Sequence, residues 1–165
     1  MKKFSTLILA LALTDTLAAQ PSCQPSTPAW EHMQNRTIKL LNTPGMQREL
    51  EVKVADETSE MAEGYKWLCP ESARNTGILF VFSRPYAGAF YMKDVFMPLD
   101  IIFFDENKRA INAESMAAVP PGSQLPIVYY RAKKPARYAL EVPQGDLQAS
   151  GLVLQYLKFE MPDSL

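Results

Sequence analysis

The chain has 165 residues, 47% of them hydrophobic, and a formal net charge of −1, which suits one globular domain with an ordinary core. It carries no basic stripe that would favour nucleic acid and no acidic block that would form a charged tail. Thirteen prolines against seven glycines favour short strands joined by rigid turns over long helices.

The first nineteen residues have the layout of a secretory signal peptide. Two lysines near the start precede an apolar stretch at 7–13, and small residues precede a plausible cleavage point after Ala19. The apolar stretch is too short for a membrane span, which needs about 20 residues. We therefore predict a signal peptide at 1–19, a periplasmic or secreted protein, and no membrane span.

Residues 20–36 are rich in proline and serine and predict an extended, polar linker. This linker holds the only histidine, His32, which we expect to be solvated. The chain has two cysteines, Cys23 and Cys69. In an oxidising compartment they predict a disulfide, with lipid attachment at Cys23 or a free, buried Cys69 as the alternatives.

Residues 37–165 predict a β-rich domain. The alternating segment 50–54 is typical of a strand with one solvated face, and 56–64 predicts one short helix that stops at Gly64. A proline-rich loop at 119–126 is long enough to form a pocket rim or lid, or serves only as a connection. One helical turn is expected at 145–151. Further strands are expected at 37–41, 77–82, 99–104, 109–117, 127–131, 138–142 and 152–160. This succession favours an all-β sandwich or barrel.

The stretch 77–105 concentrates the chain's apolar residues. Eight of the seventeen aromatic residues lie between Phe80 and Phe104, so this stretch supplies much of the core. Lys93, Asp94 and Asp100 are embedded in it, and Glu141 is embedded in the apolar strand 138–142. Charges among core residues must be paired or functional, because an unpaired buried charge is costly.

A turn near residues 96–97 would make a hairpin that places Lys93 opposite Asp100. The two would then form either a structural ion pair that fixes strand register or one side of a ligand site. Together with Asp94, Glu141 and the aromatic ring of Tyr91 they form the predicted ligand-binding set.

Three function classes follow from this set. The first is an exported accessory protein that binds a small polar ligand without transforming it. The alternatives are an envelope interaction or structural module with a protein partner, and a hydrolase that uses Asp100 and Glu141 as an acid–base pair at roughly 5–9 Å.

The residue inventory argues against several other chemistries. A Ser–His–Asp or Cys–His arrangement needs a positioned histidine, and one histidine with two cysteines cannot build a His/Cys metal site. The glycines are scattered and form no phosphate-binding loop. We therefore predict no metal and no cofactor.

Several segments carry a family resemblance. The chain contains, in this order, the segments Gly77-x-Leu79-Phe80-x-Phe82, Tyr91-Met92-Lys93-Asp94 and Pro98-Leu99-Asp100-Ile101, followed by the closing segment 136–145. Over roughly residues 50–160 the chain resembles domain-of-unknown-function family 192 and looks like an exported member of it. The resemblance implies a jelly-roll-like sandwich but no agreed activity.

Overall fold

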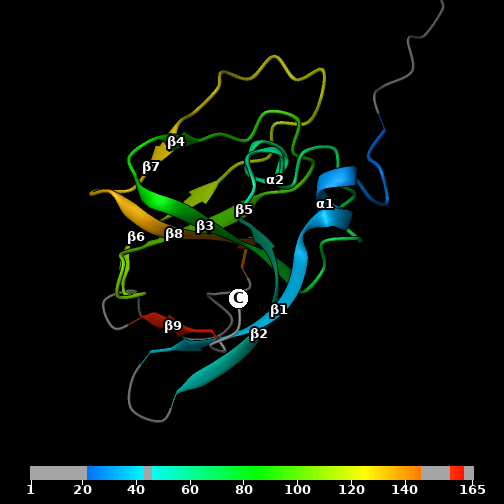
Figure 1. Ribbon diagram of the computed structural model, residues 1–165. Helices are drawn as coiled ribbons and strands as arrows, with labels where there is room; N and C mark the ends of the chain where they lie inside the picture. Colours follow the sequence, from blue (N-terminus) through cyan, green and yellow to red (C-terminus); the bar gives the residue numbers. More distant parts are fainter. Residues whose placement is uncertain (1–21, 43–45, 146–156, 162–165) are drawn as a thin grey trace, which may run out of the picture.

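The computed structural model describes residues 22–42, 46–145 and 157–161 (Figure 1). The predicted signal peptide, most of the helical turn expected at 145–151 and residues 152–156 of the last expected strand lie outside these ranges. None of the helices within them is long and apolar enough to cross a membrane. The elements are α1 (Pro28–His32), β1 (Gln34–Leu41), β2 (Gln47–Ala55), α2 (Thr58–Glu63), β3 (Thr76–Tyr86), β4 (Ala89–Phe90), β5 (Leu99–Phe104), β6 (Ala110–Met116), β7 (Tyr130–Arg131), β8 (Ala136–Pro143) and β9 (Lys158–Glu160).

Seven of the strands form one curled sheet in the order β6-β5-β8-β3-β2-β1-β9 (Figure 1). All neighbouring pairs are antiparallel except β2 and β3, which run parallel. The two ends of the sheet meet, because the Ala110 amide donates to the Leu157 carbonyl at 2.9 Å and the Phe159 amide donates to the Lys108 carbonyl at 3.1 Å. The predicted all-β barrel- or sandwich-like domain is confirmed.

The central strands β3, β5 and β8 are buried on both faces, which explains their continuous apolar runs. Successive side chains of a strand point to opposite faces, so Ile78 and Phe80 lie on the outside of the curl and Leu79 lies inside it. We call these two sides the outer face and the inner face. The inner face forms the barrel core with Ile38, Leu40, Leu50, Val52, Val54, Leu79, Ile102, Phe104, Leu140, Val142, Leu157 and Phe159.

The outer face is covered by a second layer made of α1, α2 and the two-stranded sheet β4–β7 (Figure 1). The predicted linker is therefore wrong over its second half. Thr27 caps α1, its side-chain oxygen accepting from the Trp30 amide at 3.2 Å, and Pro28 occupies the first turn, where a missing N–H costs nothing. Strand β1 also begins at Gln34, inside the expected linker.

The helix predicted at 56–64 is confirmed as α2. The Glu60 carboxylate accepts hydrogen bonds from the Asp56 and Glu57 amides, both at 3.1 Å, so it satisfies amides that have no partner within the helix. Gly64 ends the helix with a φ of 51°, a backbone conformation that favours glycine. The strand expected at 127–131 is shorter than predicted, since only Tyr130–Arg131 pairs as β7.

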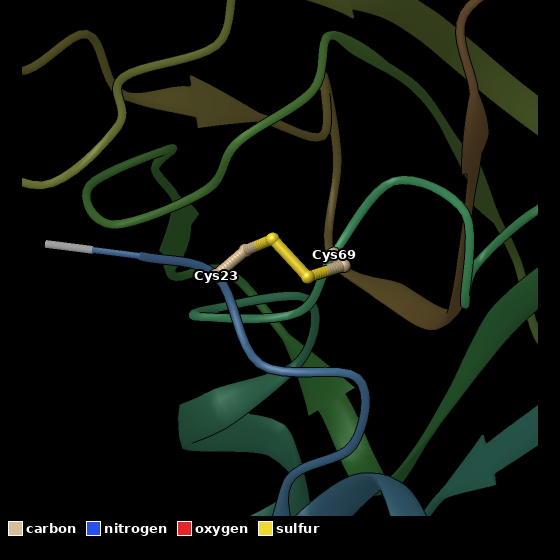
Figure 2. The surroundings of a disulfide bond; sticks show 2 residues. All are labelled: Cys23 and Cys69. Atoms are coloured by element: carbon tan, nitrogen blue, oxygen red, sulfur yellow. A yellow bond between two sulfur atoms is a disulfide. The ribbon is translucent and has the colours of Figure 1, made fainter.

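The predicted disulfide between Cys23 and Cys69 is present (Figure 2). Backbone hydrogen bonds flank it: the Gln24 amide donates to the Trp67 carbonyl at 2.7 Å, and the Cys69 amide donates to the Gln24 carbonyl at 2.8 Å. The N-terminal segment is thereby joined, covalently and by backbone pairing, to the segment that follows α2.

Candidate functional site

A cavity of about 440 Å³ lies on the outer face of the sheet. Its walls come from α2 and the turn after it, from β3 and β4, and from residues 91–95, while Leu99 of β5 and Glu141 of β8 reach it from the sheet. These elements are far apart in the sequence, so the cavity exists only once the second layer has packed onto β3, β5 and β8.

Aromatic rings make one wall of the cavity. Phe90 packs its edge against Phe80, with ring centres 5.0 Å apart, and against Tyr86 at 6.4 Å. Tyr86 also stacks on Phe82 at 4.6 Å. A side-chain carbon added at Gly88 would overlap the Tyr86 hydroxyl, so the absence of a side chain there lets Tyr86 take this position. Edge-to-face and offset stacked arrangements are the favoured geometries of such ring pairs, and they hold the wall in place.

Glu141 supplies the buried polar group of the cavity. Only 6% of its surface is exposed, and within the described part of the chain no side chain or amide hydrogen-bonds to its carboxyl group. Burial raises the pKa of this carboxyl to about 8, because a desolvated carboxylate is unfavourable. Gly64 leaves room beside it, since a Cβ at that position would lie 3.8 Å from the Glu141 carboxyl oxygen and 3.5 Å from Phe80.

Charged side chains of both signs line the rim. Asp56 and Glu63 contribute carboxylates, and Lys66 and Arg84 contribute cations. Lys66 is held in place, because its ammonium donates to the Ala62 carbonyl at 2.7 Å and to the Tyr91 hydroxyl at 3.1 Å. The same ammonium lies 4.9 Å from the centre of the Tyr91 ring, within the range of a cation–π contact.

A family model matches residues 40–155, a range that contains every residue of the cavity, and its description reads "DUF192: Uncharacterized ACR, COG1430". The chain belongs to the DUF192 family. Among curated proteins, the chain has no match.

Two solved structures share the fold of this DUF192 member. One is a provisionally named transcription regulator from Sinorhizobium meliloti 1021, with 22% identity and a TM-score of 0.66, matched over 78% of this chain and 95% of that chain. The other is a protein of unknown function from Novosphingobium aromaticivorans DSM 12444, with 24% identity and a TM-score of 0.65, matched over 92% of this chain and 99% of that chain. At these identities the likeness concerns the fold.

Of the five ligand-binding residues predicted from the DUF192 sequence, the cavity brings together Glu141 and Tyr91. Lys93 and Asp94 do not line it. Asp94 has a φ of 67°, its amide donates to the Val119 carbonyl at 2.8 Å, and its carbonyl accepts from the Trp67 amide at 2.9 Å. Its backbone therefore joins three segments of the chain, and Lys93 beside it is exposed.

The predicted pairing of Lys93 with Asp100 is wrong. Asp100 lies in β5 opposite Ser115 of β6 and Val142 of β8, and no strand pairs it with the segment of Lys93. Its carboxylate accepts from the Ser115 hydroxyl at 2.6 Å and from the Gly145 amide at 3.2 Å. Lys93 contacts the chain through a backbone bridge to Val119 instead.

Asp100 and Glu141 also point to opposite faces of the sheet. Asp100 alternates with Ile101, an outer-face residue, and Glu141 alternates with Leu140 and Val142, both on the inner face. The sheet therefore lies between the two carboxyl groups. An acid–base pair built from them has no common cleft, and the hydrolase hypothesis loses the geometry it needs.

The proline-rich loop at 119–126 contributes no residue to the cavity. Its first residue, Val119, pairs with Lys93 and Val95, so the loop begins next to the segment that forms one wall. Its continuation brings the Tyr129 ring to 6.3 Å from Tyr91. Exposed apolar side chains follow along it at Leu125, Ile127, Val128 and Tyr129.

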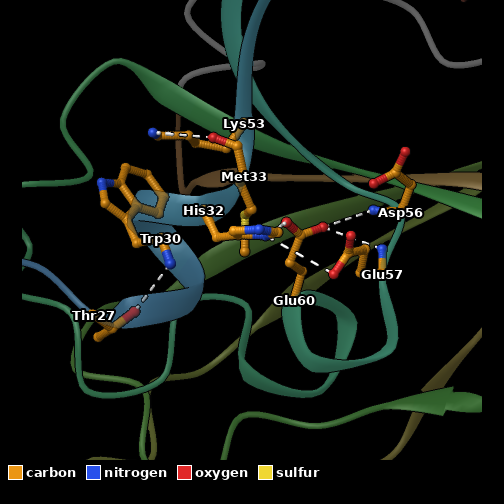
Figure 3. Close-up of polar contacts among 8 residues, drawn as sticks. All are labelled: Thr27, Trp30, His32, Met33, Lys53, Asp56, Glu57 and Glu60. Carbon is orange, nitrogen blue, oxygen red and sulfur yellow. Dashed lines mark hydrogen bonds and ion pairs between the residues drawn. The ribbon is translucent and has the colours of Figure 1, made fainter. Parts of the chain in front are cut away.

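His32 lies at the end of α1 and not in a linker, while its side chain is 65% exposed, as expected. Its Nδ1 lies 2.9 Å from a carboxylate oxygen of Glu60 and 3.9 Å from Glu57, and it joins α1 to the start of α2 (Figure 3). The hydrogen bond to Glu60, followed by the charge of Glu57, raises the pKa of His32. Burial acts to raise the pKa of Glu60, but the Glu57 amide, His32 and the Asp56 amide together lower it.

His32, Glu57 and Glu60 each place one atom that could bind a metal ion within 4.8 Å of the others. Each contact is accounted for by helix capping and by the bond between α1 and α2, so we assign the cluster a structural role. The sequence contained one signal for it: Thr27 followed by Pro28 is a helix-start pattern, and a helix there brings His32 into the outer layer.

Proposed function

We propose that this DUF192 member is an exported binding protein that holds a small ligand in the outer-face cavity, against Glu141. The observation that carries the proposal is a buried carboxyl group with no partner in the described chain, facing a cavity of about 440 Å³. Buried polar groups are normally hydrogen-bonded, and leaving one unsatisfied costs free energy. A ligand that bonds to Glu141 removes that cost.

The cavity has the composition of a small-molecule site. Its volume falls within the usual range of roughly 300–1,000 Å³, and such sites combine apolar walls with a small number of placed polar groups. Phe80, Phe82 and Phe90 supply the walls, and Met61 and Met92 add flexible, polarisable side chains. The ligand that fits is amphipathic, with one polar group for Glu141 and an apolar body for the rings.

Binding is favoured over catalysis because Glu141 carries the one buried carboxyl group among the described residues that line the cavity. General acid–base hydrolysis at a sugar bond uses two carboxyl groups near the reacting atom, and Asp100 lies on the other face of the sheet. The rim carboxylates of Asp56 and Glu63 belong to exposed side chains and are not held in a desolvated position.

Export is supported by the disulfide. Stable disulfides belong to oxidising compartments, and Cys23, one partner of the Cys23–Cys69 bridge, follows soon after the predicted signal peptide. Expression in a bacterial host with the native N-terminus, followed by mass spectrometry of the periplasmic fraction, tests this part. A processed chain starting at Gln20 is expected, and an unprocessed cytoplasmic chain contradicts export.

The binding proposal is tested by NMR of the processed protein labelled with ¹³C at the methionine methyl groups. The probes share one indole body and differ in the polar group: tryptamine, tryptophol and indole-3-acetate. At least one probe should shift the signals of Met61 and Met92, which line the cavity, and leave that of the exposed Met46 unchanged.

A matched pair of variants locates the site. Ala62 is an exposed helix residue at the cavity, so Ala62→Trp should fold normally and abolish the shifts by filling the entrance. Ala117→Trp, an exposed alanine away from the cavity, should preserve them. Absence of shifts with all three probes, or their persistence in Ala62→Trp, contradicts the cavity function.

A further inference from the structure

Building on the proposed cavity function, we infer that the ligand is an organic cation: an amine whose ammonium group pairs with the Glu141 carboxyl group while its apolar body lies along Phe80, Phe82, Tyr86 and Phe90. This assigns a charge and a chemical class to a ligand for which the family gives none. The inference follows from the sign of the charges and dipoles that face the cavity.

Once ionised, the Glu141 carboxyl group gives the inner end of the cavity a negative charge. The cavity lining includes the apolar side chains of Phe80, Val95 and Leu99, and burial is the cause of the raised pKa of Glu141, with no contribution from a cation. The hydroxyl of Tyr65, which also lines the cavity, donates to the Thr76 carbonyl at 2.7 Å and lies 3.4 Å from the backbone carbonyl of Glu141. Above pH 8 an anionic ligand group would meet the Glu141 carboxylate, so this end then selects against anions.

The aromatic wall selects in the same direction. The faces of aromatic rings carry partial negative charge, so they attract a cation and repel an anion. Four rings, Phe80, Phe82, Tyr86 and Phe90, lie within 4.6–6.4 Å of one another in the contacts they make. A group of rings beside a carboxyl is the arrangement by which proteins recognise alkylammonium groups.

The rim does not override this preference. Its two carboxylates, Asp56 and Glu63, are matched by its two cations, Lys66 and Arg84, and the Lys66 ammonium is bonded to Ala62 and Tyr91. The sign of the site is therefore set by Glu141. The ionisable groups that line the cavity are Asp56, Glu63, Tyr65, Lys66, Arg84, Tyr86, Tyr91 and Glu141.

Binding of an ammonium should release a proton. In the free protein, burial keeps the Glu141 carboxyl protonated up to a pKa of about 8. When the ammonium arrives, the carboxylic O–H bond breaks, the proton passes to solvent, and the carboxylate pairs with the cation. The association constant should therefore rise about tenfold for each pH unit between pH 6 and 8 and level off above that.

Isothermal titration calorimetry with the three indole probes tests the inference on the processed protein. At pH 8.5 we expect tryptamine to bind at least about tenfold more tightly than tryptophol, because only tryptamine can form the ion pair, and indole-3-acetate to bind most weakly. At pH 7, repetition in two buffers of different ionisation enthalpy should show release of about one proton per tryptamine bound.

Two variants separate Glu141 from the other groups. Glu141→Gln keeps the size and hydrogen-bonding capacity of the side chain but cannot carry a charge. Glu141→Gln should abolish the preference for tryptamine over tryptophol and the pH dependence of tryptamine binding, while the variant still binds tryptophol. Asp100→Asn removes a carboxylate from the other face of the same sheet. It should leave the preference for tryptamine and the pH dependence of its binding unchanged. The methionine methyl spectrum confirms that each variant is folded.

The outcomes distinguish the two proposals. If tryptophol or indole-3-acetate shifts Met61 and Met92 and binds as tightly as tryptamine at pH 8.5, the cavity function stands and the cation assignment falls. If the pH dependence of tryptamine binding persists in Glu141→Gln, another group pairs with the ammonium and the assignment to Glu141 falls. If none of the three probes binds, the cavity function falls and the cation assignment falls with it.

Discussion

The two buried acids of the central strands, Asp100 and Glu141, differ in the face of the sheet that they occupy and in their hydrogen bonding. Asp100 and Glu141 are each 6% exposed and lie on adjacent strands, β5 and β8. Asp100 faces the barrel core and accepts hydrogen bonds from Ser115 and Gly145. Glu141 faces the cavity, and no described residue hydrogen-bonds to its carboxyl group.

The difference separates structure from function. An acid that receives its hydrogen bonds from its own chain stabilises the fold and has no spare bonding capacity. An acid buried without such partners costs stability, and such a cost is found where a ligand compensates for it. The inner face is therefore a core, and the outer face is a core that contains the cavity in which we propose that a ligand binds.

The largest expected effect comes from Glu141→Gln. The folded-state pKa of Glu141 is about 8 against an ordinary 4.5, so the unfolded chain loses its proton first and stability falls as the pH rises from 4.5 to 8. At about 1.36 kcal/mol per pKa unit, the variant should be more stable than the wild type by roughly 4–5 kcal/mol above pH 8. The two should be nearly equal at pH 4.

Urea unfolding curves at pH 4, 7 and 9 measure this difference. The gap between variant and wild type should widen with pH. A gap of constant size, or a variant that is less stable at pH 9, would show that the carboxylate is bonded in the folded protein.

Removing the disulfide should destabilise the outer layer. The bridge closes a loop of 46 residues, and on the chain-entropy model its loss costs about 4 kcal/mol. We expect this from urea unfolding of the Cys23→Ser/Cys69→Ser variant, and a matching loss when the wild type is reduced. A variant as stable as the wild type would mean that the backbone pairing of Gln24 holds this layer without the bridge.

Asp100→Asn should lower the stability of the protein, whereas Glu141→Gln should raise it, and the change should be smaller. The amide oxygen can still accept from the Gly145 amide and the N–H₂ group can donate to the Ser115 hydroxyl, but both hydrogen bonds lose the charge of the carboxylate. A loss of about 1 kcal/mol is expected, because hydrogen bonds to charged groups are stronger than neutral ones, and urea unfolding at pH 7 measures it. An increase in stability would show that Asp100, like Glu141, is a buried acid without adequate partners.

The smallest effect is expected for His32→Ala. The raised pKa of His32 gives stability that is present below its ordinary 6.5 and lost as the pH rises through the folded value. The lowered pKa of Glu60 gives stability present above 4.5 and lost as the pH falls through the folded value. The Tm difference between wild type and His32→Ala should peak between pH 4.5 and 6.5. A difference independent of pH contradicts an ionic contact.

The sequence was informative wherever the physics was local. Continuous apolar runs at 77–82 and 99–104 predicted strands, and the presence of two cysteines in a chain predicted to be exported indicated a disulfide between them. Gly64 marked the end of α2. These features depend on neighbouring residues or on simple counting, so no knowledge of the tertiary arrangement was needed.

The site depends on the tertiary arrangement and was predicted only in part. Glu141 and Tyr91 stood out as polar or aromatic residues near apolar runs, but nothing local shows that α2 and β3 enclose a space above Glu141. The hairpin of Lys93 and Asp100 failed because β5 pairs with β6 and β8, while Asp94 turns the chain away with its positive φ. The contact of His32 with Glu60 was not predicted, because α1 is too short for its sequence to show the hydrophobic periodicity of a helix.

The ionisation of Glu141 tests the account most directly. A ¹³C NMR titration of the Glu141 carboxyl carbon in the ligand-free protein, assigned by comparison with Glu141→Gln, measures it. A midpoint near pH 8 is expected, because the carboxyl group is buried without a hydrogen-bond partner in the described chain. A midpoint near the ordinary value of 4.5 would show that the carboxyl group is solvated or paired, and the distinction between the two faces would fail.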